Sequence, residues 1–175
     1  MPISKTESLE TKEDLERVYN LYFDKIFRVA KMLLRDEANA ADAVQETFIR
    51  VYKYRASYDH KSSFNAWITT ILINECKRQI EKEKRITYIE DYETVKELSS
   101  DWTKEWENKE LAHSLLKQLE EPIKVPIVLK YIQGLKIDEI AKILKLNSNT
   151  VKSRLAFGRK KMREHYEEER GEESL

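Results

Sequence analysis

The sequence is poor in residues that break helices and in residues that form covalent cross-links. Of its 175 residues, only 3 are Gly, 3 are Pro and 1 is Cys. Few Gly and Pro leave long stretches of good helix formers, which predicts an all-α protein. The single cysteine, Cys76, excludes an internal disulfide, and no second Cys or His-rich neighbourhood offers a zinc site. We interpret Cys76 as a structural thiol and expect neither a metal nor a cofactor.

Long apolar runs are missing as well. No run reaches the roughly 20 residues that a membrane-spanning helix needs, and residues 1–11 have no apolar stretch typical of a signal peptide. The sequence therefore predicts a cytoplasmic protein with no direct membrane insertion. It also lacks a phosphate-binding glycine loop, a metal-ligand cluster and a nucleophile paired with a base, which argues against an enzyme.

Acidic residues are missing from one segment, although the whole chain balances 32 Lys and Arg against 32 Asp and Glu. Residues 145–163 contain no carboxylate, and the wider segment 134–163 has a net charge of +7. Residues 89–110 are the opposite, with eight acids against three Lys, and the tail from Glu164 has six Glu and one Arg. Such segregation is typical of a polyanion-binding site beside solvated acidic segments.

Hydrophobic spacing divides the chain into two small helical domains joined by a flexible acidic linker. In the first domain, apolar residues recur every three or four positions, as on one face of a helix. A polar break at 35–40 and a turn-rich loop at 55–63 interrupt this pattern. The apolar positions are Leu15, Val18, Tyr22, Ile26, Val29 and Leu33, then Val44, Phe48, Val51 and Tyr52, then Phe64, Trp67, Ile68, Ile71 and Leu72. The predicted boundaries are 12–85 for the first domain, 86–106 for the linker, 107–166 for the second domain and 167–175 for an acidic tail.

The second domain begins with a predicted helix around Leu111, Leu115, Leu116 and Leu119. Pro122 and Pro126 then indicate a break. A proline beyond the first helical turn costs about 3 kcal/mol, so we expect the next helix to begin near Pro126 and to continue to Gln133. Gly134 follows, where a left-handed backbone ends a helix.

A pair of helices after Gly134 accounts for the segment without acids. Residues 138–144 are predicted to form the first helix, and Asn147 or Ser148 suits the N-cap of the second. The second helix would place Val151, Leu155, Gly158 and Met162 on one side and polar residues on the other. With the small Ala141 at the crossing, this arrangement is that of a DNA-binding helix-turn-helix.

The outward side of the second helix supplies the groups that a duplex requires. We expect base edges to be contacted by Asn149, Thr150, Lys152 and Ser153, and phosphates by Arg154, Arg159 and Lys160. Carboxylates there would repel the DNA backbone. The alternative is a solvated basic helix with no ligand, and a stand-alone dimeric regulator would also explain this half of the chain.

Three segments together resemble the extracytoplasmic-function sigma factors, the two-domain transcription initiation factors of bacteria. Residues 134–155 resemble that family's C-terminal helix-turn-helix, 42–52 its polymerase-binding helix, and 64–74 its promoter-melting region. The order and spacing agree over residues 15–162. The sequence differs from the family pattern at Lys145, where glycine is frequent, and at Pro126.

The resemblance implies a sigma factor that binds core RNA polymerase and directs it to promoters, controlled by an anti-sigma factor in a stress or envelope response. The helix with Asp42, Gln45 and Glu46 would bind the clamp coiled coil of polymerase. The linker would thread a basic channel of polymerase. Duplex DNA would be read at the minus-thirty-five element, and the melted minus-ten strand would be bound by Tyr58, Asp59, His60, Lys61, Ser62, Ser63, Asn74, Lys77 and Arg78.

Several assignments stay open on the sequence alone. Phe64 and Trp67 suit packing better than base stacking, whereas Tyr58 suits either. The Glu-rich tail is either a solvated helix end or a segment that folds over the basic helix.

Overall fold

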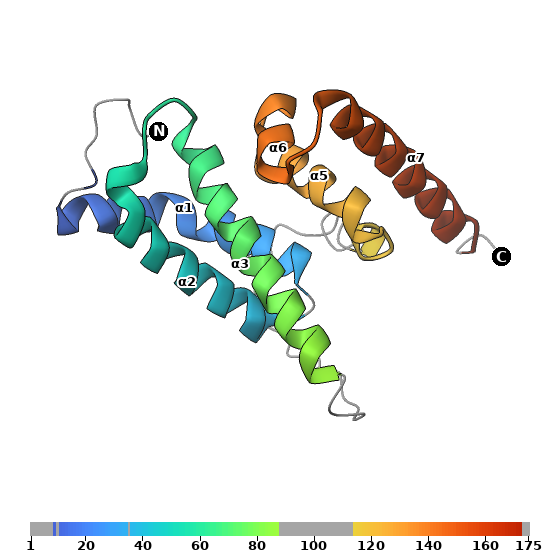
Figure 1. Cartoon of the computed structure of the whole chain (residues 1–175). Helices are drawn as coiled ribbons and strands as arrows, with labels where there is room; N and C mark the ends of the chain where they lie inside the picture. Colours follow the sequence, from blue (N-terminus) through green and yellow to red (C-terminus); the bar gives the residue numbers. More distant parts are fainter. Residues whose placement is uncertain (1–8, 10, 35, 88–113, 173–175) are drawn as a thin grey trace.

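The computed structural model describes residues 9, 11–34, 36–87 and 114–172, and the regular elements within these ranges are all helical. The prediction of an all-α fold is confirmed. The helices form two groups, which Figure 1 shows on either side of the molecule. The predicted linker lies outside the described residues except for residues 86 and 87, which are the end of a helix.

The N-terminal module consists of α1 (Lys12–Leu33), α2 (Glu37–Tyr54) and α3 (Phe64–Thr87), with a short 3-10 turn, η1 (Arg55–Ser57), after α2. Local side chains set where α1 and α2 begin. Thr11 Oγ1 accepts from the backbone N–H of Asp14, whose carboxylate accepts from that of Thr11, both at 3.1 Å. Asp36 caps α2 in the same way. The predicted polar break is therefore shorter than expected, because the cap allows α2 to begin at Glu37.

The core of this module is the predicted apolar stripe. Most of the residues with helical spacing are buried: Val18, Tyr22, Ile26 and Val29 on α1, Val44 and Val51 on α2, and Phe64, Ile68 and Leu72 on α3. Five others are half-buried, namely Leu15, Leu33, Phe48, Trp67 and Ile71. Tyr52 is exposed, with 52% of its surface open to solvent. The helices pack as α1 against α2 and α2 against α3.

The C-terminal module consists of α5 (Glu121–Tyr131), α6 (Ile137–Leu144) and α7 (Ser148–Glu172). A helical turn at 114–117 precedes it and buries Leu115, Leu116 and Leu119, as predicted for that helix. Leu111 lies outside the described residues. The part of the Glu-rich tail that is described continues α7 as a helix.

The expected start of α5 was wrong. The helix begins at Glu121, so that Pro122 occupies the first turn and Pro126 lies inside the helix. Pro126 has no N–H to donate, and the helix loses one backbone hydrogen bond there. Pro126 is itself buried with Ile127, Val128 and Leu129. Burial of this apolar run, at ~1.5–3 kcal/mol per large side chain, outweighs the cost of the proline.

Two left-handed residues form the turns on either side of α6. Gly134 has φ 71°, as predicted, and Lys145 has φ 54°. Lys145 therefore adopts the backbone that glycine adopts easily, so the side chain does not change the turn. Asn147 is the N-cap of α7, because its Oδ1 accepts from the backbone N–H of Thr150 at 2.7 Å.

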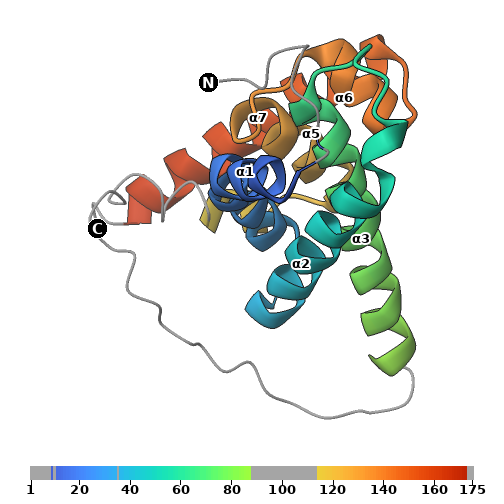
Figure 2. The same cartoon turned by 90° about the vertical axis from the view of Figure 1, so that its left-hand side faces the viewer.

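The two modules pack against each other. Helix α1 contacts α5, and α3 contacts α6. Figure 2 shows α1 and α3 beside the C-terminal module from a second side. Buried residues of both modules form one continuous hydrophobic core. The sequence predicted the two modules without predicting this contact.

Candidate nucleic-acid and protein interfaces

The outer face of α7 is polar, as the sequence predicted. Asn149, Lys152 and Ser153 are exposed, while Val151 and Leu155 on the opposite side are buried against α5 and α6. Thr150 and Arg154 are half-buried, and Arg159 and Lys160 are exposed. The N-terminal turns of α7 therefore present amides, hydroxyls and cations to solvent, the groups that can contact base edges and phosphates.

The two acids of segment 134–163 accept hydrogen bonds within the helix pair formed by α6 and α7. Asp138 Oδ1 accepts from the hydroxyl of Ser148 at 2.7 Å, and Glu139 Oε2 accepts from the backbone N–H of Lys136 at 2.9 Å. Both carboxylates lie in the first turn of α6, where the helix dipole favours negative charge. The start of α7 thus keeps the acid-free face that binding of a polyanion requires.

The cations further along α7 differ in their surroundings. Arg159 Nη1 donates to the hydroxyl of Tyr131 on α5 at 3.0 Å, which orients the guanidinium without neutralising it. Lys160 and Lys161 instead lie 3.7 and 3.0 Å from the carboxylate of Glu164. The hydrogen bond from Lys161 lowers the pKa of Glu164, followed by the charges of both lysines. Arg159 is therefore better suited than Lys160 to bind a phosphate.

The loop between η1 and α3 is built around Tyr58. Its ring contacts those of His60, Phe64 and Trp67, with centroids 4.4, 5.4 and 5.2 Å away. Its hydroxyl donates to the backbone carbonyl of Ser62 at 2.9 Å. Burial raises the pKa of Tyr58, and the charge of Asp59 adds to the shift. Tyr58 therefore orders the loop, and Phe64 and Trp67 pack beside it.

The polar tip of this loop faces solvent. Asp59, His60, Lys61 and Ser62 are exposed, and the backbone of His60 is left-handed, with φ 57°. Asp59 Oδ1 accepts from the backbone N–H of Lys61 at 3.0 Å. Ser63 differs, because its hydroxyl donates to Glu139 Oε1 on α6 at 2.5 Å. The structure thus keeps most predicted loop groups together in solvent and pairs one with the other module.

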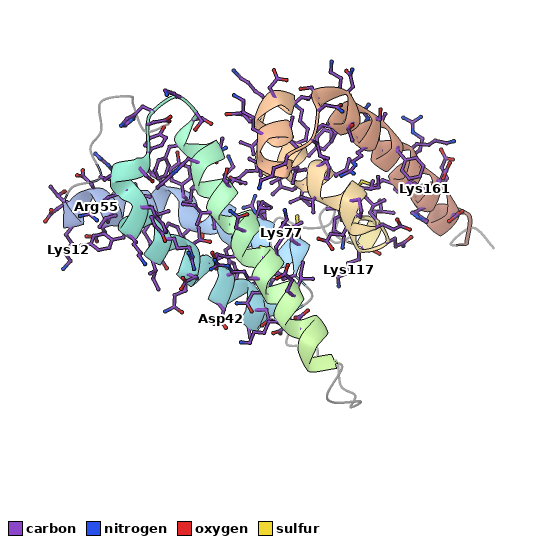
Figure 3. All side chains as sticks on the ribbon, in the orientation of Figure 1. Lys12, Asp42, Arg55, Lys77, Lys117 and Lys161 are labelled. Carbon is purple, nitrogen blue, oxygen red and sulfur yellow. The ribbon has the colours of Figure 1, made fainter. Side chains whose placement is uncertain are left out.

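A polar groove between α2 and α3 brings together the three residues predicted on α3. It has a volume of about 440 Å³ and is lined by Arg50, Tyr54, Ile71, Asn74, Glu75, Lys77, Arg78 and Glu81; Figure 3 labels Lys77 on α3. Glu75 is only 5% exposed. Its carboxylate lies 2.6 Å from Arg50 Nε and 3.4 Å from Arg78 Nη1, and so it positions both guanidiniums. Sequence reasoning missed Arg50, Tyr54 and Glu75, because only the packing of α2 on α3 places them there.

An apolar groove between α1 and α2 has a volume of about 620 Å³. It is lined by Tyr19, Phe23, Phe27, Ala41, Val44, Gln45, Phe48, Ile49 and Tyr52. Tyr19, Ile49 and Tyr52 each expose about half of their surface. Exposed aromatic and aliphatic groups gathered in one groove are typical of a protein-binding surface. The i, i+3 spacing of Ile49 and Tyr52 was the signal in the sequence.

The three residues predicted to bind a protein partner lie beside this groove. Gln45 is exposed at its wall, and Asp42 is exposed one turn earlier on α2, where Figure 3 labels it. Glu46 is half-buried and pairs with Arg50 at 3.1 Å. Asp42 and Gln45 are therefore available to a partner, whereas Glu46 also holds a residue of the polar groove.

No group of His, Cys, Asp or Glu in the described residues is arranged to hold a metal ion. Among the same residues, no helix is long and apolar enough to cross a membrane. Cys76 is buried, and burial together with the charge of Glu75 raises its pKa to about 12. This agrees with a structural thiol.

Family models match both modules. The model described as Sigma-70 region 2 covers residues 18–86, and the model described as Sigma-70, region 4 covers residues 109–162. The RNA polymerase sigma factor SigV of Bacillus subtilis is 30% identical over 78% of this chain and 81% of its own length. The ECF RNA polymerase sigma factor SigW of the same organism is 29% identical over 83% of this chain and 85% of its own length.

Two solved structures have a similar fold. The sigma factor RpoE of Bartonella quintana, in complex with the anti-sigma factor NepR, has a TM-score of 0.76 at 23% identity, over 87% of this chain and 96% of that chain. CnrH, in complex with the cytosolic domain of CnrY, has a TM-score of 0.66 at 18% identity, over 90% of each chain.

Proposed function

This chain belongs to the extracytoplasmic-function sigma factors of the sigma-70 family, and from that membership we propose how its surfaces divide the work of transcription initiation. A sigma factor binds core RNA polymerase and directs it to promoters. One observation carries the assignment of the surfaces: the exposed polar face at the start of α7, free of carboxylates, is held by a helix pair within the matched region 4. We propose the domain boundaries 12–85, 86–106, 107–166 and 167–175 given above.

The C-terminal module reads the minus-thirty-five duplex. The N-terminal end of α7 enters the major groove, where Asn149, Thr150, Lys152 and Ser153 contact base edges. Arg154, Arg159 and Lys160 bind phosphates. Arg159 contributes most among the distal cations, because Tyr131 orients its guanidinium without neutralising it, while Lys160 lies beside Glu164.

The N-terminal module binds the melted minus-ten strand on two surfaces. Extrusion of a base costs a few kcal/mol of stacking, so the strand must be held by groups that bind only the unpaired form. The exposed loop groups of Asp59, His60, Lys61 and Ser62 bind the extruded base. The polar groove holds the flanking nucleotides through Asn74, Lys77 and Arg78, with Tyr54 as an aromatic face.

The apolar groove between α1 and α2 is the docking surface for polymerase. Its aromatic wall supplies the buried centre that stable interfaces need, and Asp42 and Gln45 supply polar contacts at its rim. A helical partner with both apolar and basic residues fits this surface, which agrees with the clamp coiled coil expected from the family.

The remaining assignments follow from the same family. We propose that the protein acts in the cytoplasm, performs no catalysis of its own and is controlled by an anti-sigma factor. The RpoE structure, which was solved with an anti-sigma factor bound, supports that control. Its inducing conditions would be those of a stress or envelope response.

The function is tested by run-off transcription on a randomised promoter library with purified core polymerase. We expect transcripts only when both proteins are present, from templates that share minus-thirty-five and minus-ten elements. The same samples are run on gel filtration, where we expect co-elution with polymerase. A stand-alone regulator would elute separately and bind DNA as a dimer, and either result would contradict the proposal.

Two matched variants test the apolar groove. Ile49→Asp places a charge in the groove, whereas Leu21→Asp places the same charge on α1 outside it, and both side chains are about half exposed. Burial of a charge against an apolar partner costs several kcal/mol. We expect Ile49→Asp to weaken polymerase binding at least about tenfold and Leu21→Asp to leave it unchanged. Equal affinities for the two variants would place polymerase elsewhere on the protein.

The capture loop is tested without disturbing the packing of Tyr58. Lys61→Ala together with Ser62→Ala removes exposed groups and retains the hydrogen bond from Tyr58, which uses the backbone of Ser62. We expect transcription from duplex promoters to fall and polymerase binding to be unaffected. A template with a pre-opened bubble should restore transcription, and failure of that rescue would refute the role in strand capture.

A further inference from the structure

One large apolar side chain lies among the polar groups on the outer face of α7. Phe157 exposes 49% of its surface. The chain has five phenylalanines, and the other four are buried or half-buried in the N-terminal module. The next residue, Gly158, is buried against Ile127 on α5, so Phe157 lies just outside the packed side of the helix. A partner that covers this ring would recover the free energy that its exposure to water costs.

Phe157 lies one turn beyond the residues proposed to contact bases. Residues four apart lie on the same side of an α-helix, so the exposed side chains of Asn149 and Ser153 form one row with Phe157. The row is about 12 Å long at ~1.5 Å per residue. Helices that lie along the major groove contact bases over about two turns. When the start of α7 enters the groove, Phe157 therefore reaches base edges as well.

The groups around Phe157 favour DNA over a protein as the partner. Lys160 is exposed one turn further on, and residues 145–163 contain no carboxylate. Lys161, which Figure 3 labels, has its Nζ 5.9 Å from the centroid of the Phe157 ring. A protein-binding patch gathers several exposed apolar residues. In the described part of α7, the only other large one is Tyr166, which is nine residues away and so lies on the opposite side of the helix.

The chemistry of the major groove determines which group an apolar ring can contact there. Every base edge presents hydrogen-bond donors or acceptors, and a phenylalanine side chain can pair with neither. Phosphates are bound by cations and by polar hydrogens, which the ring also lacks. The one apolar group in the groove is the C5 methyl of thymine, and phenylalanine is among the side chains that contact it.

We propose that Phe157 is a specificity-determining residue, which packs against the methyl group of one thymine in the minus-thirty-five element. The inference rests on the proposed function and adds an apolar contact to the polar base contacts given there. The polar residues at the start of α7 read the hydrogen-bonding atoms of the bases, whereas Phe157 reads a methyl group. The contact involves no charge, so it adds sequence preference without adding salt dependence.

Removal of the methyl group from the DNA tests the contact directly. In the promoter selected from the randomised library, the thymines of the minus-thirty-five element are replaced one at a time by uracil, which pairs identically and lacks only the methyl. Affinity for holoenzyme is measured by fluorescence anisotropy. At one position we expect wild type to bind the uracil promoter about fourfold more weakly, which corresponds to about 0.8 kcal/mol for burial of one methyl-sized group. Phe157→Ala should bind the two promoters equally at that position.

Tyr166→Ala is the matched control, because it removes an exposed aromatic ring from the opposite side of the same helix. It should keep the wild-type preference for thymine at every position. Phe157→Ala should keep the wild-type salt slope, since it removes no charge. The proposal is overturned if Phe157→Ala discriminates thymine from uracil as wild type does, if wild type discriminates at no position, or if the selected element contains no thymine.

Two further measurements separate failure of this inference from failure of the proposed function. Transcription by wild type with core polymerase on the thymine promoter tests the sigma factor function alone, and its absence would refute that function. Transcription by wild type together with unaltered discrimination in Phe157→Ala would refute only the methyl contact. Gel filtration of Phe157→Ala with core polymerase should show the same co-elution as wild type. Loss of co-elution would show that Phe157 contacts polymerase and would overturn the assignment to DNA.

Discussion

Arg159 provides a test that separates charge from orientation in promoter binding. Arg159→Ala removes a cation proposed to bind a phosphate. Tyr131→Phe keeps that cation and removes only the hydroxyl that accepts from it at 3.0 Å. Lys117→Ala is the matched control, because it removes an exposed cation from the same module away from α7, as Figure 3 shows.

The two substitutions should change different quantities: Arg159→Ala the salt dependence of the affinity, and Tyr131→Phe the affinity alone. Each phosphate contact contributes a slope of about −0.9 to the plot of log affinity against log salt. Loss of one contact should therefore make the ratio of wild-type to Arg159→Ala affinity about 3.5 times larger at roughly 50 mM than at roughly 200 mM salt. Tyr131→Phe frees the arginine side chain to move, and its reordering costs about 0.5 kcal/mol or slightly more. This corresponds to a two- to threefold weaker complex with an unchanged slope.

The assay is fluorescence anisotropy of a labelled promoter, titrated with holoenzyme made from core polymerase and each variant. Lys117→Ala should reproduce the wild-type line. The reasoning is refuted if Arg159→Ala retains the wild-type slope, since the guanidinium would then displace no counterions. A change of slope in Tyr131→Phe would equally refute it, because that variant retains every charge.

Three further predictions concern stability and reactivity. A Cβ on Gly158 would lie 2.9–3.0 Å from Ile123 and Ile127 on α5. Overpacking costs about 1–3 kcal/mol, which exceeds the helix propensity gained, about 1 kcal/mol. Gly158→Ala should therefore lower the melting temperature, and a raised melting temperature would contradict the packing. Lys145→Gly should raise the free energy of unfolding by about 0.5 kcal/mol. The free energy gained by relieving the left-handed backbone of Lys145 exceeds the cost of the added conformational entropy of the unfolded chain. A lower free energy of unfolding in urea titrations would refute this. Cys76, with its pKa raised from 9.0 to about 12, should react with a thiol reagent at pH 8 about a thousandfold more slowly in native than in unfolded protein. As pH rises above 9 the unfolded chain loses this proton first, so native stability should fall, and a rise would refute the burial of the thiol.

Much of the fold follows from local patterns that the sequence states directly. The apolar spacing predicted the helices, Gly134 and Asn147 marked the ends of the helix pair, and the acid-free segment predicted the polar face of α7. The exception, α5, shows the limit of local rules. Pro126 is unfavourable in a helix on its own, and only the burial of the residues that follow it makes the longer helix stable.

The surfaces between helices were harder to predict. The sequence indicated Asn74, Lys77 and Arg78, yet it did not indicate that Arg50 and Glu75 hold them in a groove, because that depends on how α2 crosses α3. Gln133 was treated as a helix end. In the structure its side-chain amide donates to Asn65 and Thr69 on α3, more than 60 positions away, and periodicity within one helix contains no such information.

The core that continues across both modules has a consequence for engineering. Each module is proposed to read one promoter element, so exchanging one module for that of a relative should create a new pairing of upstream and downstream elements. Here a donor module without a counterpart for Gln133, or a recipient without Asn65 and Thr69, would meet a surface shaped for a different neighbour. Hybrids that keep these three residues should retain the buried hydrogen bonds between the modules, and hybrids that mismatch them should melt at a lower temperature, because a buried polar group is left unpaired.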